Sequence, residues 1–180
     1  MAIAEGDLKL LLKALAFAAR KHRDQRRKDI EASPYINHPI TLAAILCVEG
    51  HVTDVETICG ALLHDTVEDT DTTSLELERE FGAAIANIVM EVTDDKTLAK
   101  AERKRLQVEH AAHISSKAKL VKLADKIANV RDIAASPPTE WSLARRQEYF
   151  DWAKRVVDNL RGAHPSLERA FDAAYESRPS

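Results

Sequence analysis

Side chains that could do chemistry are concentrated in one short stretch of this 180-residue chain, from Ala61 to Thr70. Apolar residues lead up to His64 and Asp65, and two more carboxylates, Glu68 and Asp69, follow within about one helical turn. The apolar residues predict a buried helix end, where polar groups are costly unless something such as a divalent cation pairs with them. A helix end with a few capping carboxylates would show the same pattern, so the stretch alone leaves both interpretations open.

His38 is a second candidate ligand. It precedes Pro39, whose fixed φ favours the first turn of a helix that we expect to run from about Pro39 to Val48. A lone histidine at such a place is commonly structural, so a ligand role for His38 depends on what converges there.

Asp125 is a third. The apolar spacing of residues 118–133 predicts an amphipathic helix, with Asp125 within or beside its apolar face and Asn129 one turn further on the same side. Aspartate is a poor mid-helix residue and is rarely buried unpaired. An acid and an amide stacked there suggest a site, and a buried salt bridge to Lys122 or Lys126 is the structural alternative.

Together these positions form a set of two imidazoles and two carboxylates: His38, His64, Asp65 and Asp125. Such a set suits a borderline-to-hard divalent ion such as manganese, iron or zinc. A helical bundle can project these groups inward from different helices, and four protein ligands leave coordination positions for water and substrate.

Two cationic segments invite opposite interpretations. The run from Arg20 to Lys28 is either a solvated helix end or an anion cradle, and the net charge of −3 makes such a local concentration favour the cradle. The charged segment 100–110, with Arg103-Lys104-Arg105, is interpreted as a solvated surface helix. His110 and His113 have spacing that could clamp a metal, but no third ligand flanks them, so we interpret them as surface residues.

The elements that must position these side chains are all helical. We expect helices over 8–20, 39–48, from a Thr53–Glu56 capping box through Leu62, from a Thr73–Glu76 capping box to Phe81, and over 83–92, 100–110, 118–133, 140–160 (capped by Thr139) and 165–175. No strand pattern, repeat or linker is evident in the sequence. The expectation is an all-α bundle forming one domain over 1–180, with its core over about 8–160.

Composition narrows the class of protein. The net charge of −3 argues against a nucleic-acid binder, and no apolar run is long enough to span a membrane. Cys47 and Cys59 lie in apolar stretches and are interpreted as small core residues in a reducing compartment. We therefore expect a cytoplasmic protein without membrane or nucleic-acid partners, whose oligomeric state the sequence leaves open.

The set His38…His64-Asp65…Asp125 resembles the pattern of the HD superfamily of metal-dependent phosphohydrolases. More narrowly, the chain is similar to the guanosine tetraphosphate hydrolase domain of the RelA/SpoT group and to stand-alone small alarmone hydrolases of the Mesh1 type. The segments that carry the resemblance are Arg26-Arg27-Lys28, Pro34 to Pro39, Ala61 to Thr70, Val92-Thr93-Asp94, Val121 to Lys126 and Asn129-Val130-Arg131. The chain departs from the family at Ala128, where an aromatic residue or histidine is usual.

The resemblance implies an all-α HD fold and a set of roles. His38, His64, Asp65 and Asp125 would hold one ion, typically Mn²⁺, with Fe²⁺ or Zn²⁺ as alternatives. Glu68 and Asp69 would position or deprotonate the attacking water. Arg27, Lys28, Asn129 and Tyr149 would bind the nucleotide. The implied reaction removes pyrophosphate from the 3′ position of ppGpp or pppGpp.

Other readings stay open at this point. They are a related HD phosphohydrolase acting on another nucleotide, such as an NADPH 2′-phosphatase; a two-metal phosphodiesterase, which would need more histidine ligands than His110 and His113 provide; a non-catalytic nucleotide-binding domain; and a purely structural helical domain.

Overall fold

The computed structural model describes residues 4–180, and within that range the regular structure is helical, as the sequence predicts. The only β-type pairing among these residues is an isolated bridge between Arg26 and Pro34. The elements are α1 (Glu5–Lys21), α2 (Asn37–Ala44), the π-helix η1 (Ile45–Glu49), α3 (Val55–Leu63), α4 (Thr66–Asp69), α5 (Ser74–Phe81), α6 (Ala83–Val92), α7 (Lys100–His110), α8 (Ser116–Ala135), α9 (Leu143–Asp158) and α10 (Pro165–Tyr175).

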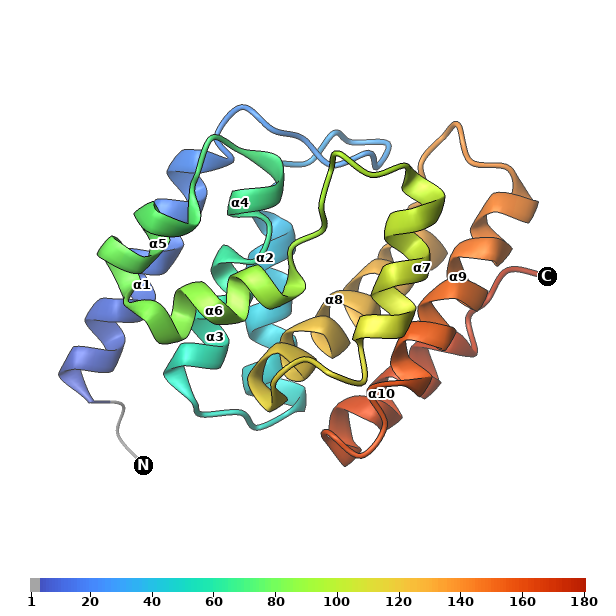
Figure 1. Cartoon of the computed structure of the whole chain (residues 1–180). Coiled ribbons are helices and arrows are strands. Elements are labelled where there is room, and N and C mark those ends of the chain that lie inside the picture. Colours follow the sequence, from blue (N-terminus) through green and yellow to red (C-terminus); the bar gives the residue numbers. More distant parts are fainter. Residues whose placement is uncertain (1–3) are drawn as a thin grey trace.

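Helix α8 is the element that the others pack around. It contacts α2, α3 and α6 from the N-terminal half of the chain and α9 and α10 from the C-terminal half. In Figure 1, α1 and α5 lie on one side of the molecule and α7, α9 and α10 on the other. Because α8 joins both sides, a side chain on α8 can meet residues from either half of the sequence.

Two apolar clusters follow this division. One contains the buried faces of α8, α9 and α10, with Phe150 and Phe171 among its largest side chains. The other joins α1, α3, α5 and α6, where the rings of Phe17 and Phe81 meet edge to face with their centroids 5.3 Å apart. The stretch that leads to His64 runs through this second cluster, with Cys59 and Leu63 fully buried.

Side-chain caps determine where helices α5 and α3 begin. The Thr73 hydroxyl accepts a hydrogen bond from the Glu76 amide, as predicted. At α3 the cap is Asp54, not Thr53, and its carboxylate accepts from both the amide and the hydroxyl of Thr57. A carboxylate that takes two donors at once outcompetes the neighbouring threonine for the cap position.

Helix α9 starts three residues later than predicted. Ser142 is its cap, accepting from the Arg145 amide, whereas Thr139 lies in the preceding loop. The Trp141 amide donates to the carbonyl of Pro138, so the chain makes a turn first, and Trp141 stands outside the helix. The Trp141 ring lines a cavity that is described below.

The prediction that both cysteines are core residues is wrong for Cys47. Cys59 is buried, but Cys47 is exposed. The chain becomes a π-helix at Ile45–Glu49, and only Ile45 and Leu46 of this segment reach the core. Over residues 4–180, no helix combines the length and apolar character needed to cross a membrane.

Candidate metal and phosphate site

Three of the predicted ligands converge. His38 lies in the first turn of α2, His64 ends α3, and Asp65 follows in the short break before α4. One potential ligand atom from each of the three lies within 4.8 Å of the others. Both imidazoles are buried and Asp65 nearly so, which matches the buried helix end that the sequence predicts.

His64 is held with one nitrogen directed to this focus. Its Nδ1 donates to the carbonyl of Ala61 at 2.8 Å, which fixes the ring. Its Nε2 is buried, lies 2.8 Å from Oδ2 of Asp65, and has no partner with hydrogen-bond geometry among residues 4–180. A nitrogen arranged in this way is available as a ligand.

Asp125 lies next to the His38–His64–Asp65 group but is not one of the three residues whose ligand atoms lie within 4.8 Å of one another. Its Oδ1 is 3.3 Å from Nε2 of His38 and accepts a hydrogen bond from Asn129 Nδ2 at 2.5 Å. Its Oδ2 pairs with Lys126 at 2.9 Å. The salt-bridge interpretation of Asp125 is therefore correct for Lys126, and the same carboxylate also faces His38.

The charges in this group are strongly coupled. Burial lowers the pKa of His38. Burial also opposes charge on His64, but the carboxylate of Asp65 outweighs it and raises the pKa to about 8. The pKa values of Asp65 and Asp125 lie below their ordinary range despite burial, because His64 faces the first carboxyl and Lys126 and His38 face the second.

Glu68 and Asp69 stand beside the group on α4. Burial raises the pKa of Glu68 to about 7, with the nearby carboxylates adding to the effect while the amide of Asp94 donates to Oε2 at 3.0 Å and opposes it. Asp69 accepts from Gln25 at 3.1 Å and pairs with Lys96. A carboxyl with a pKa near neutrality has the affinity for protons that a general base needs.

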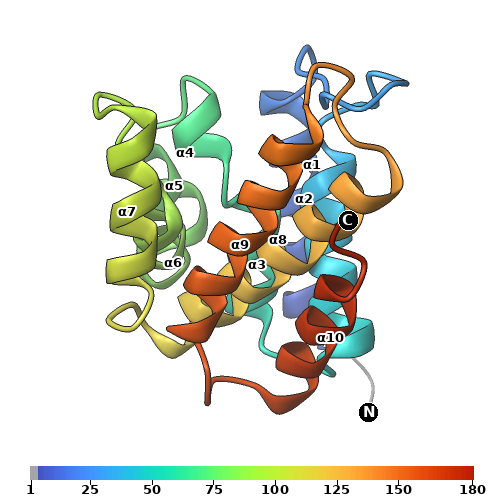
Figure 2. The same cartoon turned by 90° about the vertical axis from the view of Figure 1, so that its right-hand side faces the viewer.

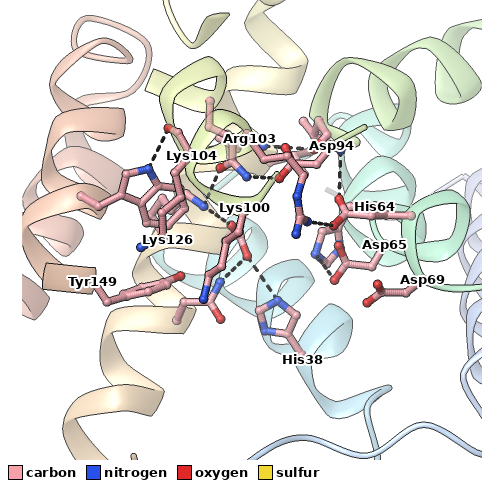
Figure 3. A pocket seen from close by; sticks show the side chains of 18 of the residues that line it. His38, His64, Asp65, Asp69, Asp94, Lys100, Arg103, Lys104, Lys126 and Tyr149 are labelled. Carbon is pink, nitrogen blue, oxygen red and sulfur yellow. Dashed lines mark hydrogen bonds and ion pairs between the residues drawn. The ribbon is translucent and has the colours of Figure 1, made fainter. Parts of the chain in front are cut away.

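These side chains open onto a cavity of about 290 Å³ (Figure 3). Helices α7 and α9, whose ribbons are labelled in Figure 2, contribute further lining residues. A second cavity of about 570 Å³ adjoins it and shares part of its wall. Arg27, Asn129 and Tyr149 line both cavities, whereas Lys28 lines the second alone. All four predicted nucleotide-binding residues thus lie along one continuous hollow.

Arg27 is held where the two cavities meet. Its guanidinium donates to Asp132 at 2.7 Å and to Asn129 at 3.3 Å, and Asn129 in turn donates to Asp125. The residues at 125, 129 and 132 follow one face of α8. Ala128 is buried in the core and lines neither cavity. The position where the family usually has an aromatic residue or histidine therefore has a packing role in this chain.

Helix α7 has no buried residue, as expected for a surface helix, but one of its faces lines the first cavity. Lys100, Arg103, Lys104 and Gln107 line the first cavity, on the face that i, i+3, i+4, i+7 spacing creates. The Lys104 ammonium lies 5.0 Å from the centroid of the Trp152 ring. Burial and neighbouring cations lower the pKa values of Lys100 and Lys104.

Other cavity residues also escaped prediction. Arg145 lies over the Trp141 ring, with 4.4 Å between guanidinium carbon and centroid, and both line the cavity. The only sequence signal for them was the concentration of aromatic and basic residues in 141–152. His110 and His113 are exposed, as predicted.

The donors present fit a divalent cation. Two buried imidazoles and a carboxylate share one focus, an imidazole nitrogen there lacks a hydrogen-bond partner, and a further carboxylate adjoins them. Nitrogen and carboxylate oxygen in this proportion suit several first-row metals, so the donor set implies a metal site without choosing the metal.

Comparisons with known proteins agree with this picture. The sequence model of the HD domain matches residues 14–151. A Danio rerio protein named guanosine-3′,5′-bis(diphosphate) 3′-pyrophosphohydrolase MESH1 is 59% identical over 169 residues, 94% of each chain. The Homo sapiens protein of that name is 58% identical over 168 residues, covering 93% of this chain and 94% of its own.

A solved structure described as "A metazoan ortholog of SpoT hydrolyzes ppGpp and plays a role in starvation responses" superposes with a TM-score of 0.92. It is 48% identical, and the match covers 99% of this chain and 98% of that one. The chain belongs to the HD-domain family, and within that family to the MESH1 proteins.

Proposed function

We propose that this chain is a metal-dependent hydrolase of guanosine 3′,5′-bis(diphosphate), ppGpp or pppGpp, that releases pyrophosphate from the 3′ position and leaves GDP or GTP. The observation that carries the proposal is the compact His38–His64–Asp65 group opening onto a cavity with a cationic far wall. The activity named for the MESH1 relatives supports the same choice of substrate.

In this proposal His38, His64, Asp65 and Asp125 hold one divalent ion, with Mn²⁺ expected and Fe²⁺ or Zn²⁺ compatible with the donors. The ion would supply Lewis acidity and make water more acidic at this position. Ala61 and Tyr35 hold the ligands in place, since the first accepts from His64 and the second donates to Asp65 at 2.5 Å.

Glu68 takes the proton of the attacking water, and Asp69 orients that water. The water oxygen forms a bond to the phosphorus attached to the ribose 3′ oxygen, and the bond between that phosphorus and the 3′ oxygen breaks. The proton that Glu68 took from the water passes to the 3′ oxygen, which leaves as a hydroxyl. Glu68 suits this role because one of its oxygens is fixed by the Asp94 amide while its pKa of about 7 favours proton uptake.

Cationic residues bind the two diphosphates. Arg27 and Lys28 take the side of the hollow next to the second cavity, where Asn129 and Tyr149 help to seat the nucleoside. Lys100, Lys104 and Arg145 line the opposite side, and their mutual repulsion without bound anion favours phosphate. We expect this activity in the cytoplasm.

The test is turnover by protein stripped with a chelator and then reloaded with Mn²⁺, with ppGpp and NADPH assayed side by side. Pyrophosphate from ppGpp is the expected product. Inorganic phosphate from NADPH without pyrophosphate from ppGpp would make this chain an NADPH 2′-phosphatase, and binding of ppGpp without turnover would make it a nucleotide-binding domain.

A matched pair of variants tests the ligand assignment separately. His64→Asn should lose most of the bound Mn²⁺, measured by atomic absorption after desalting. His113→Asn changes an exposed histidine outside both cavities and should keep the wild-type content. Equal metal content in the two variants would remove His64 from the site.

A further inference from the structure

Among the cations that line the first cavity, Arg103 is distinguished by a donor atom that is both buried and unpartnered among residues 4–180. Its Nε is buried and unpartnered, and among residues 4–180 no hydrogen bond leaves its guanidinium. By contrast, Lys126 pairs with Asp125, Lys122 donates to the Val92 carbonyl, and Arg27 donates to Asp132. A buried donor that neither water nor an acceptor reaches is costly, so the Nε of Arg103 favours the arrival of an acceptor.

The position of Arg103 places it at the reacting end of the hollow. Its Nη1 lies 4.0 Å from Oε1 of Glu68, too far for a hydrogen bond, and its side chain is only 25% exposed. In Figure 3 the Arg103 side chain reaches from α7 toward the His64–Asp65 pair, and all three residues line the first cavity. The other oxygen of Glu68 is taken by the Asp94 amide, so Arg103 faces the oxygen left to act on water.

Arg105 on the same helix supplies the contrast. It is half exposed, points away from the cavity and donates to both Glu102 and Glu109. Arg103 and Arg105 are separated by one residue but have opposite surroundings. Arg105 is paired with two carboxylates, whereas Arg103 has no carboxylate within hydrogen-bond distance. An anion entering the cavity would find its free donors at Arg103.

We propose that Arg103 is a catalytic residue that donates to a non-bridging oxygen of the 3′ phosphoryl group as water attacks it beside Glu68. The assignment rests on the proposed function and adds a residue to it. A planar guanidinium can hold two phosphoryl oxygens at once, and it binds them more strongly as negative charge builds up in the transition state. Lys100, Lys104 and Arg145 line the same cationic wall and remain available to bind the second diphosphate.

The experiment compares Arg103→Gln, Arg103→Lys and Arg105→Gln with the wild type in Mn²⁺-loaded protein. We expect Arg103→Gln to lower kcat by about 10²-fold or more with a smaller change in KM. Arg103→Lys should recover part of the loss, because it restores the charge without the fork. Arg105→Gln should turn over like the wild type.

Binding of inorganic pyrophosphate to metal-free protein, measured by calorimetry, is the second readout. The wild type and Arg105→Gln should bind alike, and Arg103→Gln should bind at least about tenfold more weakly. Thermal unfolding of each variant verifies that it is folded. If ppGpp is not a substrate but pyrophosphate binding still depends on Arg103, the proposed function fails while the anion site at Arg103 stands.

The inference is overturned if Arg103→Gln keeps kcat/KM within about threefold of the wild type, or if it and Arg105→Gln lose activity equally. Unchanged pyrophosphate affinity in Arg103→Gln, or no measurable pyrophosphate binding by the wild type, also counts against it. In each of these cases turnover of ppGpp by the wild type would leave the proposed function intact.

Discussion

Two lysine–aspartate pairs in this protein differ mainly in their exposure to solvent. Lys126 lies 2.9 Å from Asp125, with 3% and 14% of the two side chains exposed. Lys154 lies 2.7 Å from Asp158, with 45% and 44% exposed. Because the N–O distances are nearly equal, a comparison of the two pairs reports how burial changes the contribution of an ion pair to the free energy of unfolding.

Removing Lys126 by substitution with methionine leaves a buried carboxylate without its cation. Breaking a buried pair in this way typically costs about 3–5 kcal/mol. The Asn129 amide still donates to Asp125, and the methionine stem can still pack on the Trp152 ring, so we expect a loss near the lower end, about 3 kcal/mol. Lys154→Met removes an exposed pair at i, i+4 spacing and should cost no more than about 0.5 kcal/mol.

The assay is urea unfolding followed by circular dichroism at neutral pH with a chelator present, so that no metal stabilises either variant. A loss of about 3 kcal/mol corresponds to a fall in Tm of roughly 6–12 °C for a chain of this size. The reasoning is refuted if the two variants differ in unfolding free energy by less than about 1 kcal/mol, because burial would then not govern the value of these pairs.

The remaining predictions concern packing, catalysis and pH. A Cβ added at Gly60 would lie 2.6 Å from Cγ2 of Ile88, whereas one at Gly6 meets nothing within 4 Å among residues 4–180. The unfolding free energy of Gly60→Ala, measured in urea, should therefore be about 1–3 kcal/mol lower than that of Gly6→Ala, and equal values would contradict this close α3–α6 contact. Glu68→Gln should keep its Mn²⁺ but turn over about 10²-fold more slowly or worse; full activity in a metal-loaded variant would exclude Glu68 as the base. The pKa of Glu68 is raised from 4.5 to about 7 in the folded protein. Its contribution to the unfolding free energy is therefore fully present below pH 4.5 and is lost as the pH rises through 7, because the buried carboxyl must then ionise. In urea unfolding of metal-free protein, the stability of Glu68→Gln relative to wild type should therefore grow by up to about 3 kcal/mol between about pH 5 and 8, and a flat difference would show that burial does not raise this pKa.

The segments with the proposed metal ligands are recognisable in the sequence because their polar side chains conflict with their apolar surroundings. Asp125 breaks an otherwise apolar helix face, and the i+4 spacing to Asn129 fixes their contact before any tertiary structure is known. The run ending at Leu63 predicts burial, so the polar pair that follows it needs partners. The meeting of His38 with His64 and Asp65 is different, since it depends on the packing of α2 against α3, which local spacing does not specify.

The cationic wall could not be predicted for a related reason. Helix α7 has no buried residue and is charged all round, so its sequence contains no apolar stripe to distinguish the cavity face from the solvent face. Lys104 and Arg105 are neighbours of the same charge, yet one lies over Trp152 and the other pairs with Glu102 and Glu109. Only the position of α7 relative to α9 decides between them.

Cys47 shows the opposite failure, in which an apolar context suggests burial that the fold does not provide. A regular continuation of α2 repeats its buried positions every three or four residues. The π-helix widens the turn after Ala44 and places Cys47 and Val48 on the solvent side, while Arg131 and Glu49 form a two-bonded ion pair next to it at 2.7 and 2.9 Å. A change of helix type is an effect of tertiary packing that composition does not signal.

The cavity owes its chemistry to the way it separates charges between the two halves of the chain. Asp65, Glu68 and Asp69 come from the α3–α4 segment, whereas Lys100, Arg103, Lys104 and Arg145 come from α7 and α9. If the two sets were mixed they would neutralise each other as surface pairs do, and neither a cation nor a phosphate would be held strongly. Helix α8 packs against both halves and places Asp125 and Lys126, one of each sign, in contact where the two sets meet. In the proposed function, the carboxylate wall would hold the metal ion and the cationic wall the phosphates of the nucleotide, which is the arrangement that hydrolysis of a phosphate ester requires.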